Sequence, residues 1–381
     1  MKKVIRTSTV PISLDSLLRG QLKFLNQYYD VVAVSGEGER LRSVESREGV
    51  RVHPIEMQRQ IAPLKDLASL WKLYRFFKKE KPDIVHSITP KAGLLSMMAA
   101  KFAGVPVRIH MFTGLIFPTQ TGIKQKILIA MDRLLCRFAT HIFPEGQGVR
   151  NDLIKFNITK KPLKIIANGN VNGIDTAHYD SELFSSQQRD LRQEWKIDPD
   201  DFVFIFVGRL VKDKGIRELV DAFSSLLQSH PNAKLLLLGR FESHLDPIDP
   251  LTLKTIETTP QIITAGYQID VRPFLALADV FVLPSYREGF PNVVMQAGAM
   301  DLPSIVTDIN GANEIIIDGE NGLIVPPKDE AKLVAAMQRL LEDDGLREQM
   351  AASARGLIAS RYEQQTVWNA ILEEYRIVAG A

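Results

Sequence analysis

Short apolar runs rich in β-branched residues alternate with segments of helical periodicity along the whole chain. In the first half, strands are expected at residues 3–9, 30–35, 50–54, 83–87, 105–111, 141–143 and 163–167. Helices are expected between them, near residues 16–28, 64–80, 91–103, 122–139 and 145–157. Because these strands are apolar throughout rather than alternating, the pattern predicts a parallel sheet with helices on both faces.

The same alternation begins again after a polar stretch at residues 180–201. Further strands are expected at residues 202–207, 233–239, 261–265, 280–284, 303–307 and 322–325. Helical patterns follow from about residue 328, break near residues 343–345 and 361, and leave a last helix around residues 363–378. We therefore expect an N-terminal domain over residues 1–185, joined by a C-terminal helix over about 361–381, and a C-terminal domain over residues 186–360.

This organisation predicts an α/β fold of two facing Rossmann-like, doubly wound parallel-sheet domains. Ligands of such open sheets bind at the carboxyl ends of the strands, so functional residues are expected in the loops after the strands, around an inter-domain cleft. The length of 381 residues, with 45% hydrophobic and 24% charged residues, suits two buried cores and excludes a disordered chain or a coiled-coil rod.

The chain has one cysteine, Cys136, which excludes an intramolecular disulfide and a thiolate metal cluster. The basic N-terminus lacks the apolar run of a signal peptide, and no apolar stretch of about 18 residues occurs. These features indicate a cytoplasmic protein, with any membrane contact peripheral and at the inner face of the plasma membrane.

Charge is distributed unevenly, although the formal net charge is only +2. Residues 1–190 hold 29 Lys and Arg against 17 Asp and Glu, whereas residues 191–381 hold 18 against 28. The basic half suits an anionic membrane surface or ligand, and residues 122–138 mix apolar and basic side chains as an interfacial helix does. The alternatives are that the basic residues only form solvated faces and that the apolar residues of 122–138 pack in the core. Nucleic acid is not expected as a partner, because the basic residues are scattered over many helices.

The nearest match to a dinucleotide-binding G-x-G-x-x-G motif is GEGERL at residues 36–41. Leu41 replaces the third glycine, and Glu37 and Glu39 would repel a pyrophosphate at the start of a helix. No P-loop motif occurs either. A dehydrogenase and a P-loop nucleotidase are therefore both poorly supported.

A better anion site follows the expected strand at residues 202–207, which leads into GRLVKDKG at residues 208–215 and then into a helix. Gly208 lets a ligand approach the backbone, while Arg209 and Lys214 lie within reach of the helix N-terminus. A guanidinium, an ammonium and helix N–H groups suit a diphosphate without a metal ion. The alternative is a solvated basic turn with Asp213 as its partner.

Another strand leads into PSYREGFPN at residues 284–292, where Pro291 suits the first turn of a helix that runs to about residue 299. Glu288 can accept hydrogen bonds from hydroxyl groups, and Gln296 faces the same side two helical turns later. Hydroxyl-binding groups beside an anion site describe a sugar nucleotide. For Glu288 the alternative is a loop carboxylate that caps the helix or pairs with Arg287.

With these motifs the sequence resembles the retaining glycosyltransferases of the two-domain GT-B type, family 4, over nearly the whole chain. TDINGANE at residues 307–314 and DGENG at 318–322 also fit, and VHSITPKAG at 85–93 and NGNVNGID at 168–175 are similar to members that build bacterial surface polysaccharides. The resemblance implies that Arg209 and Lys214 hold the donor diphosphate and that no metal or other cofactor is needed. The implied donor-binding residues are Gly208, Gly289, Phe290, Pro291, Asn292, Gln296, Gln268, Val271 and, in place of a Gly-rich loop, Gly20. The implied acceptor-side residues are Lys91, Thr113 and Gly114.

Two positions depart from that family. Gln296 stands where the family has a glutamate that usually meets the ribose hydroxyls, and an amide without charge predicts weaker donor binding with the geometry retained. Thr113 stands where many relatives have a histidine, and His110 lies three residues earlier, at the end of an expected strand. Residues 110 and 113 of a strand face opposite sides. His110 is a candidate catalytic or sugar-contacting residue, and a structural histidine is the alternative.

The resemblance implies a retaining hexosyltransferase in which the donor phosphate takes the acceptor proton, while Arg209, Lys214 and Glu288 align the reactants and stabilise charge. A UDP-sugar donor and a lipid-linked or polysaccharide acceptor are expected, and the base, the hexose and the acceptor stay open. A hydrolase that pairs Glu288 with Asp308 or Glu314, or an epimerase of the same fold, is a rival. So is a nucleotide-sugar-binding protein in which Gln296 marks lost catalysis.

Overall fold

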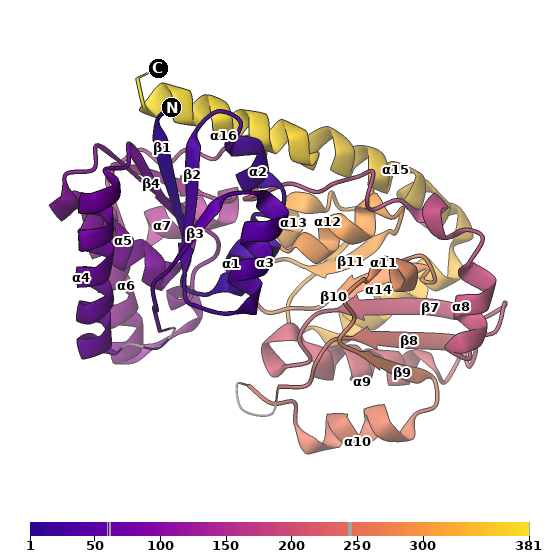
Figure 1. Ribbon diagram of the computed structural model, residues 1–381. Helices are drawn as coiled ribbons and strands as arrows, with labels where there is room; N and C mark the ends of the chain where they lie inside the picture. Colours follow the sequence, from indigo (N-terminus) through magenta and orange to yellow (C-terminus); the bar gives the residue numbers. More distant parts are fainter. Residues whose placement is uncertain (59, 61, 243–245, 381) are drawn as a thin grey trace. The chain divides into compact units, whose positions relative to one another are not determined.

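The computed structural model describes residues 1–58, 60, 62–242 and 246–380. The chain forms two compact units, residues 1–173 with 364–381 and residues 174–363. Each unit has its own six-stranded sheet in which all neighbouring strands are parallel (Figure 1). The predicted fold class, two doubly wound α/β domains, is confirmed.

The first unit has the strand order β3-β2-β1-β4-β5-β6. Its strands are β1 (Lys3–Thr7), β2 (Asp30–Ser35), β3 (Arg51–Pro54), β4 (Ile84–Ser87), β5 (Val107–Phe112) and β6 (His141–Pro144). Its helices are α1 (Pro11–Leu17), α2 (Gln21–Leu25), α3 (Glu39–Glu48), α4 (Pro63–Glu80), α5 (Pro90–Ala103), α6 (Gly122–Phe138), α7 (Gln147–Lys155) and α16 (Gln364–Val378), with a short 3-10 helix η1 (Phe117–Thr119). Val4 and Ile5 of β1 belong to separate core clusters on opposite faces of the sheet, the first with residues of α16 and the second with residues of α4 and α5.

Helices α4, α5 and α6 form one layer on a single face of this sheet. The crossovers through α4, α5 and α6 all step across the sheet in the same direction, and right-handed connections then place the three helices on the same side. Helix α5 contacts both α4 and α6 (Figure 1). Their N-termini lie at the edge of the sheet where the strands end.

Helix α16 is fixed to the other face by a buried polar contact. Arg6 of β1 donates from Nη1 to the Tyr375 hydroxyl over 2.7 Å, and this hydroxyl is hydrogen-bonded to His86 Nδ1 over 2.6 Å. Burial, and then the charge of Arg6, hold the pKa of His86 well below its ordinary value, so the imidazole is neutral. The first unit is therefore completed by a helix that follows the second unit in the sequence.

The second unit has the strand order β12-β11-β10-β7-β8-β9 around one hydrophobic core. Its strands are β7 (Phe202–Val207), β8 (Ala233–Leu238), β9 (Ile262–Gly266), β10 (Val280–Leu283), β11 (Ser304–Thr307) and β12 (Gly322–Val325). Its helices are α8 (Gln188–Glu194), α9 (Ile216–Leu226), α10 (Pro250–Thr258), α11 (Arg272–Leu275), α12 (Asn292–Ala299), α13 (Ala312–Ile315), α14 (Glu330–Glu342) and α15 (Asp344–Tyr362), with 3-10 helices η2 (Ser181–Phe184) and η3 (Lys212–Lys214).

The chain enters and leaves the second unit at adjacent points. Ile174 N donates to Tyr362 O over 2.8 Å, and Ile174 forms an isolated parallel bridge with Glu363. Phe184 is buried in the core of the second unit. The chain thus passes from one compact unit to the other at residues 173/174 and 363/364, whereas the sequence pattern put the boundaries at 185/186 and 360/361.

In the first unit, three local features differ from the prediction. The expected helix at residues 16–28 is divided between the end of α1 and α2, because the chain leaves the helical conformation at Leu18 and Gly20, with a φ of +80°, caps a new helix. The expected strand at 163–167 is reduced to a single bridge between Leu163 and Ile142. Helix α3 was not expected. Within the described ranges, no helix is both long and apolar enough to cross a membrane.

Candidate functional site

The loop after β7 carries the guanidinium that the sequence singled out. Arg209 is half-exposed, and its Nη1 donates to Glu242 Oε2 over 3.0 Å. The backbone of Gly208 packs against Gly239, which directly follows β8, since a Cβ atom at Gly239 would lie 1.7 Å from Gly208 O. A carboxylate therefore pairs with the group that we expect to hold a phosphate. Sequence reasoning missed Glu242, which lies 33 residues from its partner.

Lys214 lies at the end of η3, and Gly215, with a φ of +69°, caps α9. The ammonium of Lys214 pairs with Glu288 Oε1, and both side chains are largely buried. The structure thus brings together a lysine and a carboxylate from two motifs that are 74 residues apart.

Further contacts join the loop after β7 to the loop after β10. Tyr286 N donates to Asp213 O over 2.9 Å, and Arg287 Nη2 donates to Asp213 Oδ2 over 2.8 Å. A Cβ atom at Gly215 would lie only 2.1 Å from Pro284 O. Asp213 and Arg287, which were considered as partners within their own loops, pair with each other instead.

The loop after β10 continues into α12, with Pro291 at its N-cap. Phe290 is buried, and its ring centroid lies 5.4 Å from that of Tyr362, so its side chain belongs to the core. A Cβ atom at Gly311 would lie 2.3 Å from Gly289 O, so these two segments pack backbone to backbone. This packing fixes the start of α12, whose first N–H groups lack acceptors within the helix and suit an anion.

Gln296 lies one helical turn after Asn292 on α12. Its Nε2 donates to the Tyr179 hydroxyl over 2.8 Å. Tyr179 precedes Gln296 by 117 residues, in the segment that enters the second unit. No pattern in the sequence indicated this contact.

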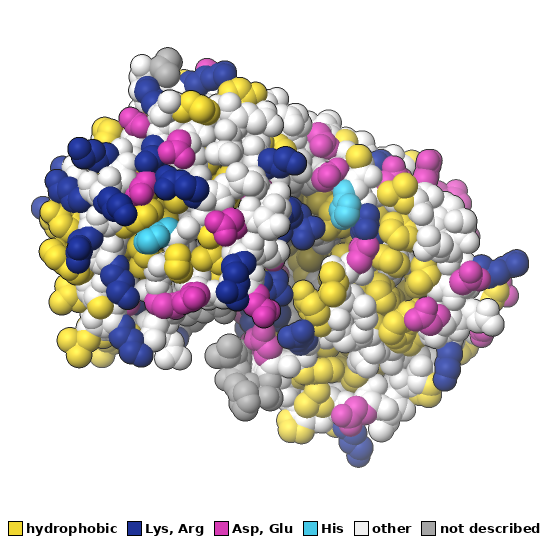
Figure 2. Space-filling view, in the orientation of Figure 1, with side chains coloured by type: hydrophobic (Ala, Val, Ile, Leu, Met, Phe, Trp, Pro, Cys, Tyr) yellow, Lys and Arg dark blue, Asp and Glu magenta, His cyan; other side chains and the backbone are white. Residues whose placement is uncertain are grey.

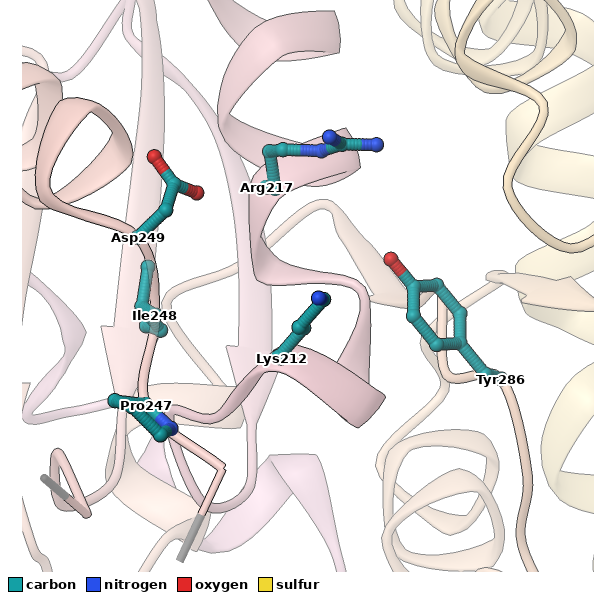
Figure 3. A pocket seen from close by; sticks show the side chains of 6 residues that line it. All are labelled: Lys212, Arg217, Pro247, Ile248, Asp249 and Tyr286. Carbon is teal, nitrogen blue, oxygen red and sulfur yellow. The ribbon is translucent and has the colours of Figure 1, made fainter. Parts of the chain in front are cut away.

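Tyr286 points toward α9 and lines a separate pocket. Its hydroxyl donates to Glu218 Oε2 over 2.6 Å, and burial, followed by Glu218, raises the pKa of Tyr286. Arg217 pairs with Glu218 over 3.0 Å, and Asp249 accepts from backbone N–H groups at the start of α10. The pocket, of about 160 Å³, is lined by Lys212, Arg217, Pro247, Ile248, Asp249 and Tyr286 (Figure 3). These contacts show that Tyr286 anchors the loop that carries Glu288.

The expected base-contact residues lie between β9 and α11. Gln268 Nε2 donates to a backbone oxygen at the end of β9 over 2.6 Å, and Val271 is the N-cap of α11. Beside them, the Arg240 guanidinium lies 4.5 Å from the centroid of the half-exposed Tyr267 ring. The loops after β8 and β9 therefore present a cation and an aromatic ring at the carboxyl edge of the sheet.

Residues expected on the acceptor side lie in the first unit. Lys91 is buried and pairs with Asp66 of α4. Thr113 Oγ1 donates to Ile88 O over 2.7 Å, and Gly114, with a φ of +111°, turns the chain after β5. Thr113 and Gly114 thus lie at the carboxyl edge, whereas Lys91 is covered by protein.

Gly20 and His110 are both enclosed by their neighbours. A Cβ atom at Gly20 would lie 2.6 Å from the Trp368 ring of α16. His110 Nδ1 lies 2.8 Å from Ser87 Oγ, and a Cβ atom at Gly93 would lie 2.5 Å from His110 Cε1. Burial lowers the pKa of His110 to about 3, so the ring is neutral and contacts protein.

The two motifs of the second unit follow adjacent strands at the point where the strand order reverses. Strands β8 and β9 lie on one side of β7, and strands β10, β11 and β12 lie on its other side. Ligands of doubly wound sheets bind at such a switch point. Arg209 and Lys214, each paired with a carboxylate, lie there together with the start of α12. Among the residues that the structure describes, no three His, Cys, Asp or Glu side chains gather as metal ligands would.

Comparisons with known proteins agree with this arrangement. Residues 187–357 match the family model described as glycosyl transferases group 1, and residues 24–169 match the glycosyl transferase 4-like domain. The chain is 33% identical over 377 residues to the capsular polysaccharide biosynthesis glycosyltransferase CapM of Staphylococcus aureus, covering 98% of this chain and 97% of that protein. It is 27% identical over 289 residues to the UDP-Gal:alpha-D-GlcNAc-diphosphoundecaprenol alpha-1,3-galactosyltransferase of Escherichia coli, covering 75% and 73%.

Among solved structures, Anabaena Alr3699/HepE in complex with UDP superposes with a TM-score of 0.82 at 19% identity, covering 99% of this chain and 100% of that one. A glycosyltransferase from Rickettsia africae superposes with a TM-score of 0.81 at 18% identity, covering 99% and 98%. These likenesses extend over both units and show the same fold.

Proposed function

Because the chain belongs to the group 1 glycosyltransferases with the GT-B fold, we propose that it transfers a sugar from a nucleoside-diphosphate sugar with retention of configuration. We propose UDP as the nucleotide and a lipid-linked or polysaccharide acceptor of surface-glycan synthesis, capsular polysaccharide included. The observation that carries the donor assignment is the grouping of Arg209, Lys214 and the start of α12 at one switch point. The names of the relatives support the choice of UDP and of a glycan product.

In the proposed reaction the second unit stabilises the leaving diphosphate. Two cationic side chains and the N-terminus of α12 neutralise charge that grows on the phosphates as the glycosidic bond breaks. Removing one such contact from an enzyme commonly raises the barrier by about 3–4 kcal/mol. The donor phosphate itself takes the proton of the acceptor hydroxyl, so no protein nucleophile is required.

On the acceptor side, Thr113 and Gly114 are proposed to line the path of the incoming hydroxyl group. His110 lies beneath them, neutral and bonded to Ser87. We propose that His110 shapes the end of β5 and thereby the position of Thr113. We propose that Gly20, which packs on Trp368, and Lys91, which pairs with Asp66, support this edge from inside the first unit.

The test is a screen of nucleotide sugars by thermal shift, followed by turnover measurements. A tight ligand raises the melting temperature by mass action. UDP-sugars should stabilise the protein more than GDP-, ADP- or dTDP-sugars, and the stabilising donor should release free UDP, faster with acceptor present. A shift with GDP-sugars alone would overturn the choice of UDP. No shift and no release with any donor would overturn the transferase assignment, whereas binding without release would favour a binding protein.

The first unit is also proposed to dock on an anionic membrane, where a lipid-linked acceptor would reside. Helix α4 exposes Leu64 and Trp71, 86% and 59% accessible, and α6 exposes Ile123 and Ile127, 78% and 46% accessible. On each helix these residues recur at helical spacing, on the side opposite the buried residues. Both helices belong to the same layer, so both apolar stripes point away from the sheet.

The charges around these stripes favour an anionic surface. Every exposed charged side chain on α4 and α6 is basic: Lys65, Lys72, Arg75, Lys78, Lys79, Lys124, Lys126, Arg133 and Arg137. Figure 2 shows Lys and Arg side chains gathered over the first unit with hydrophobic side chains between them. Each basic residue near an anionic leaflet contributes about 1 kcal/mol to the free energy of membrane binding, and apolar side chains that insert into the bilayer strengthen the binding further.

Vesicle flotation tests the docking surface. The protein should float with vesicles of phosphatidylglycerol but not of phosphatidylcholine, and less at high salt. Changing Trp71 and Ile123 to Ser should weaken binding about ten-fold or more, because each removes an inserting apolar side chain. The matched control changes Leu251 and Ile269 to Ser; these residues are 74% and 96% exposed in the second unit. An equal loss of vesicle binding in the two double variants would refute the assignment of this docking surface.

A further inference from the structure

The amide of Gln296 is held by a residue outside both donor motifs. Its Nε2 donates to the Tyr179 hydroxyl over 2.8 Å, and its Oε1 has no hydrogen-bond partner among the described residues. Because one N–H of the amide is bonded to the phenol, the orientation of the amide is fixed and its carbonyl oxygen is left as an acceptor. The side chain therefore offers an incoming ligand a neutral acceptor in a defined orientation, beside its second N–H.

Arg355 of α15 fixes Tyr179 relative to α12. Its Nη1 donates to Tyr179 O over 2.7 Å and also to Ala299 O, the last residue of α12. Its Nη2 donates to Thr176 O over 2.7 Å and to Asp180 Oδ2 over 3.2 Å. One planar guanidinium thus joins the segment that carries the phenol to the helix that carries the amide. A lysine could not make this set of contacts, because it lacks the fixed fork of donors.

We propose that Tyr179 and Arg355 are positioning residues that orient the Gln296 amide toward the ribose hydroxyls of the donor. The inference rests on the proposed function, since it takes the ligand to be a nucleoside diphosphate. Gln296 lies on the same helix as the N–H groups assigned to the diphosphate, one turn further along. A ribose lies next to its phosphates in any nucleotide, so a side chain one turn further along the helix is suitably placed to meet it.

The hydrogen-bond direction gives the proposal a distinctive consequence. With Gln at 296, the amide donates to the phenol oxygen. With Glu at 296, the carboxylate can only accept, so the Tyr179 hydroxyl must donate to it. A tyrosine serves both cases because its hydroxyl both donates and accepts, whereas phenylalanine serves neither. Tyr179→Phe should therefore weaken UDP binding both in the wild-type background and in the Gln296→Glu background.

The experiment measures binding of UDP, 2′-deoxy-UDP and 3′-deoxy-UDP by calorimetry. Wild-type protein should prefer UDP to at least one deoxy analogue. Tyr179→Phe should weaken UDP binding about five-fold, the scale of one hydrogen bond, and leave the affinity for that analogue nearly unchanged. Arg355→Lys should act in the same direction. Tyr74→Phe, which removes a phenol hydroxyl from the first unit, is the matched control and should leave all three affinities unchanged.

The preference for UDP over the deoxy analogue is the readout that a merely structural role would not move. An equal loss of affinity for all three nucleotides in Tyr179→Phe would overturn the inference, as would no loss for any. Wild-type protein that binds no UDP but binds GDP would overturn only the choice of base, and the same comparison with GDP and its deoxy forms would apply. Wild-type protein that binds no nucleotide would overturn the proposed function and this inference together.

A second measurement does not depend on a nucleotide. Tyr179→Phe, Gln296→Leu and the double variant form a cycle whose melting temperatures report the direct contact between the two side chains. The melting temperature of the double variant should fall by less than the sum of the decreases in the two single variants. Strict additivity would show that the contact does not hold the amide, and would overturn the positioning role even if UDP binds.

Discussion

Replacing Lys214 by Met tests the ion pair at the centre of the proposed donor site. The side chains of Lys214 and Glu288 are 15% and 14% exposed. Lys214→Met leaves the carboxylate without its cation in a largely buried position. Breaking a fully buried pair costs about 3–5 kcal/mol, and an exposed pair is worth about 0–1 kcal/mol. We expect an intermediate loss of about 2–3 kcal/mol in the free energy of unfolding, which lowers the melting temperature by roughly 5–10 °C for a unit of this size.

The double variant Lys214→Met and Glu288→Met separates stability from function. Replacing both charges by apolar side chains removes the uncompensated carboxylate, so stability should return to within about 1 kcal/mol of wild type. Turnover should not return, because the ammonium assigned to the leaving diphosphate is still missing. Losing that contact corresponds to about 100- to 1,000-fold in rate.

The assays are denaturant unfolding followed by circular dichroism and the rate of nucleotide release from the donor. If Lys214→Met keeps turnover within about three-fold of wild type, the lysine does not hold the diphosphate. If the double variant is as unstable as the single one, the loss comes from packing rather than from an unpaired charge. Either result would refute the corresponding half of the reasoning.

Arg209→Ala should lower turnover about 100- to 1,000-fold in steady-state kinetics with an unchanged circular dichroism spectrum, since the guanidinium is half-exposed; near-normal turnover would contradict its role. Glu242→Gln should tighten donor binding about 2- to 5-fold by calorimetry, because it releases Arg209 from an exposed ion pair. Gly215→Ala should reduce both stability and turnover, because its φ is +69° and the new Cβ would lie 2.1 Å from a facing carbonyl oxygen, whereas Gly356→Ala, with open space around it, should not. Burial raises the pKa of Asp132 from 3.8 to about 7, so the folded state holds a proton that the unfolded state releases, and the free energy of unfolding should fall between about pH 4 and pH 7. Asp132→Asn should remove that fall in denaturant titrations across this pH range, and an unchanged pH profile would contradict the burial argument.

The strands were predictable because burial on both faces leaves a continuous apolar run. Residues 202–207 form β7 as expected for this reason. Helix α3 was missed because its ten residues are mostly polar and only Leu41 and Val44 are buried apolar side chains. The break between α1 and α2 was missed because the helical pattern runs through it. The chain leaves the helical conformation at Leu18, and Gly20 then caps α2 in the left-handed conformation, which a glycine within a helical pattern does not by itself show.

The motifs of the candidate site were also predictable, because each one lies on a single loop. Their partners were not. Lys214 and Glu288 are 74 residues apart, and Gln296 and Tyr179 are 117 apart. Such contacts depend on the strand order, which brings the ends of β7 and β10 side by side. Local periodicity carries no information about which distant loops become neighbours.

The placement of α16 affects how the chain can be synthesised and divided. On the ribosome, residues 1–173 emerge first, but the helix that supplies Tyr375 to Arg6 and His86 is translated only after the second unit. The contiguous stretch 174–363 can complete its core earlier, so the half made first is finished last. Ile174 and Glu363 are bridged neighbours, so a short linker can join residue 173 to residue 364, and a gene built in this way should yield the first unit as an independent protein.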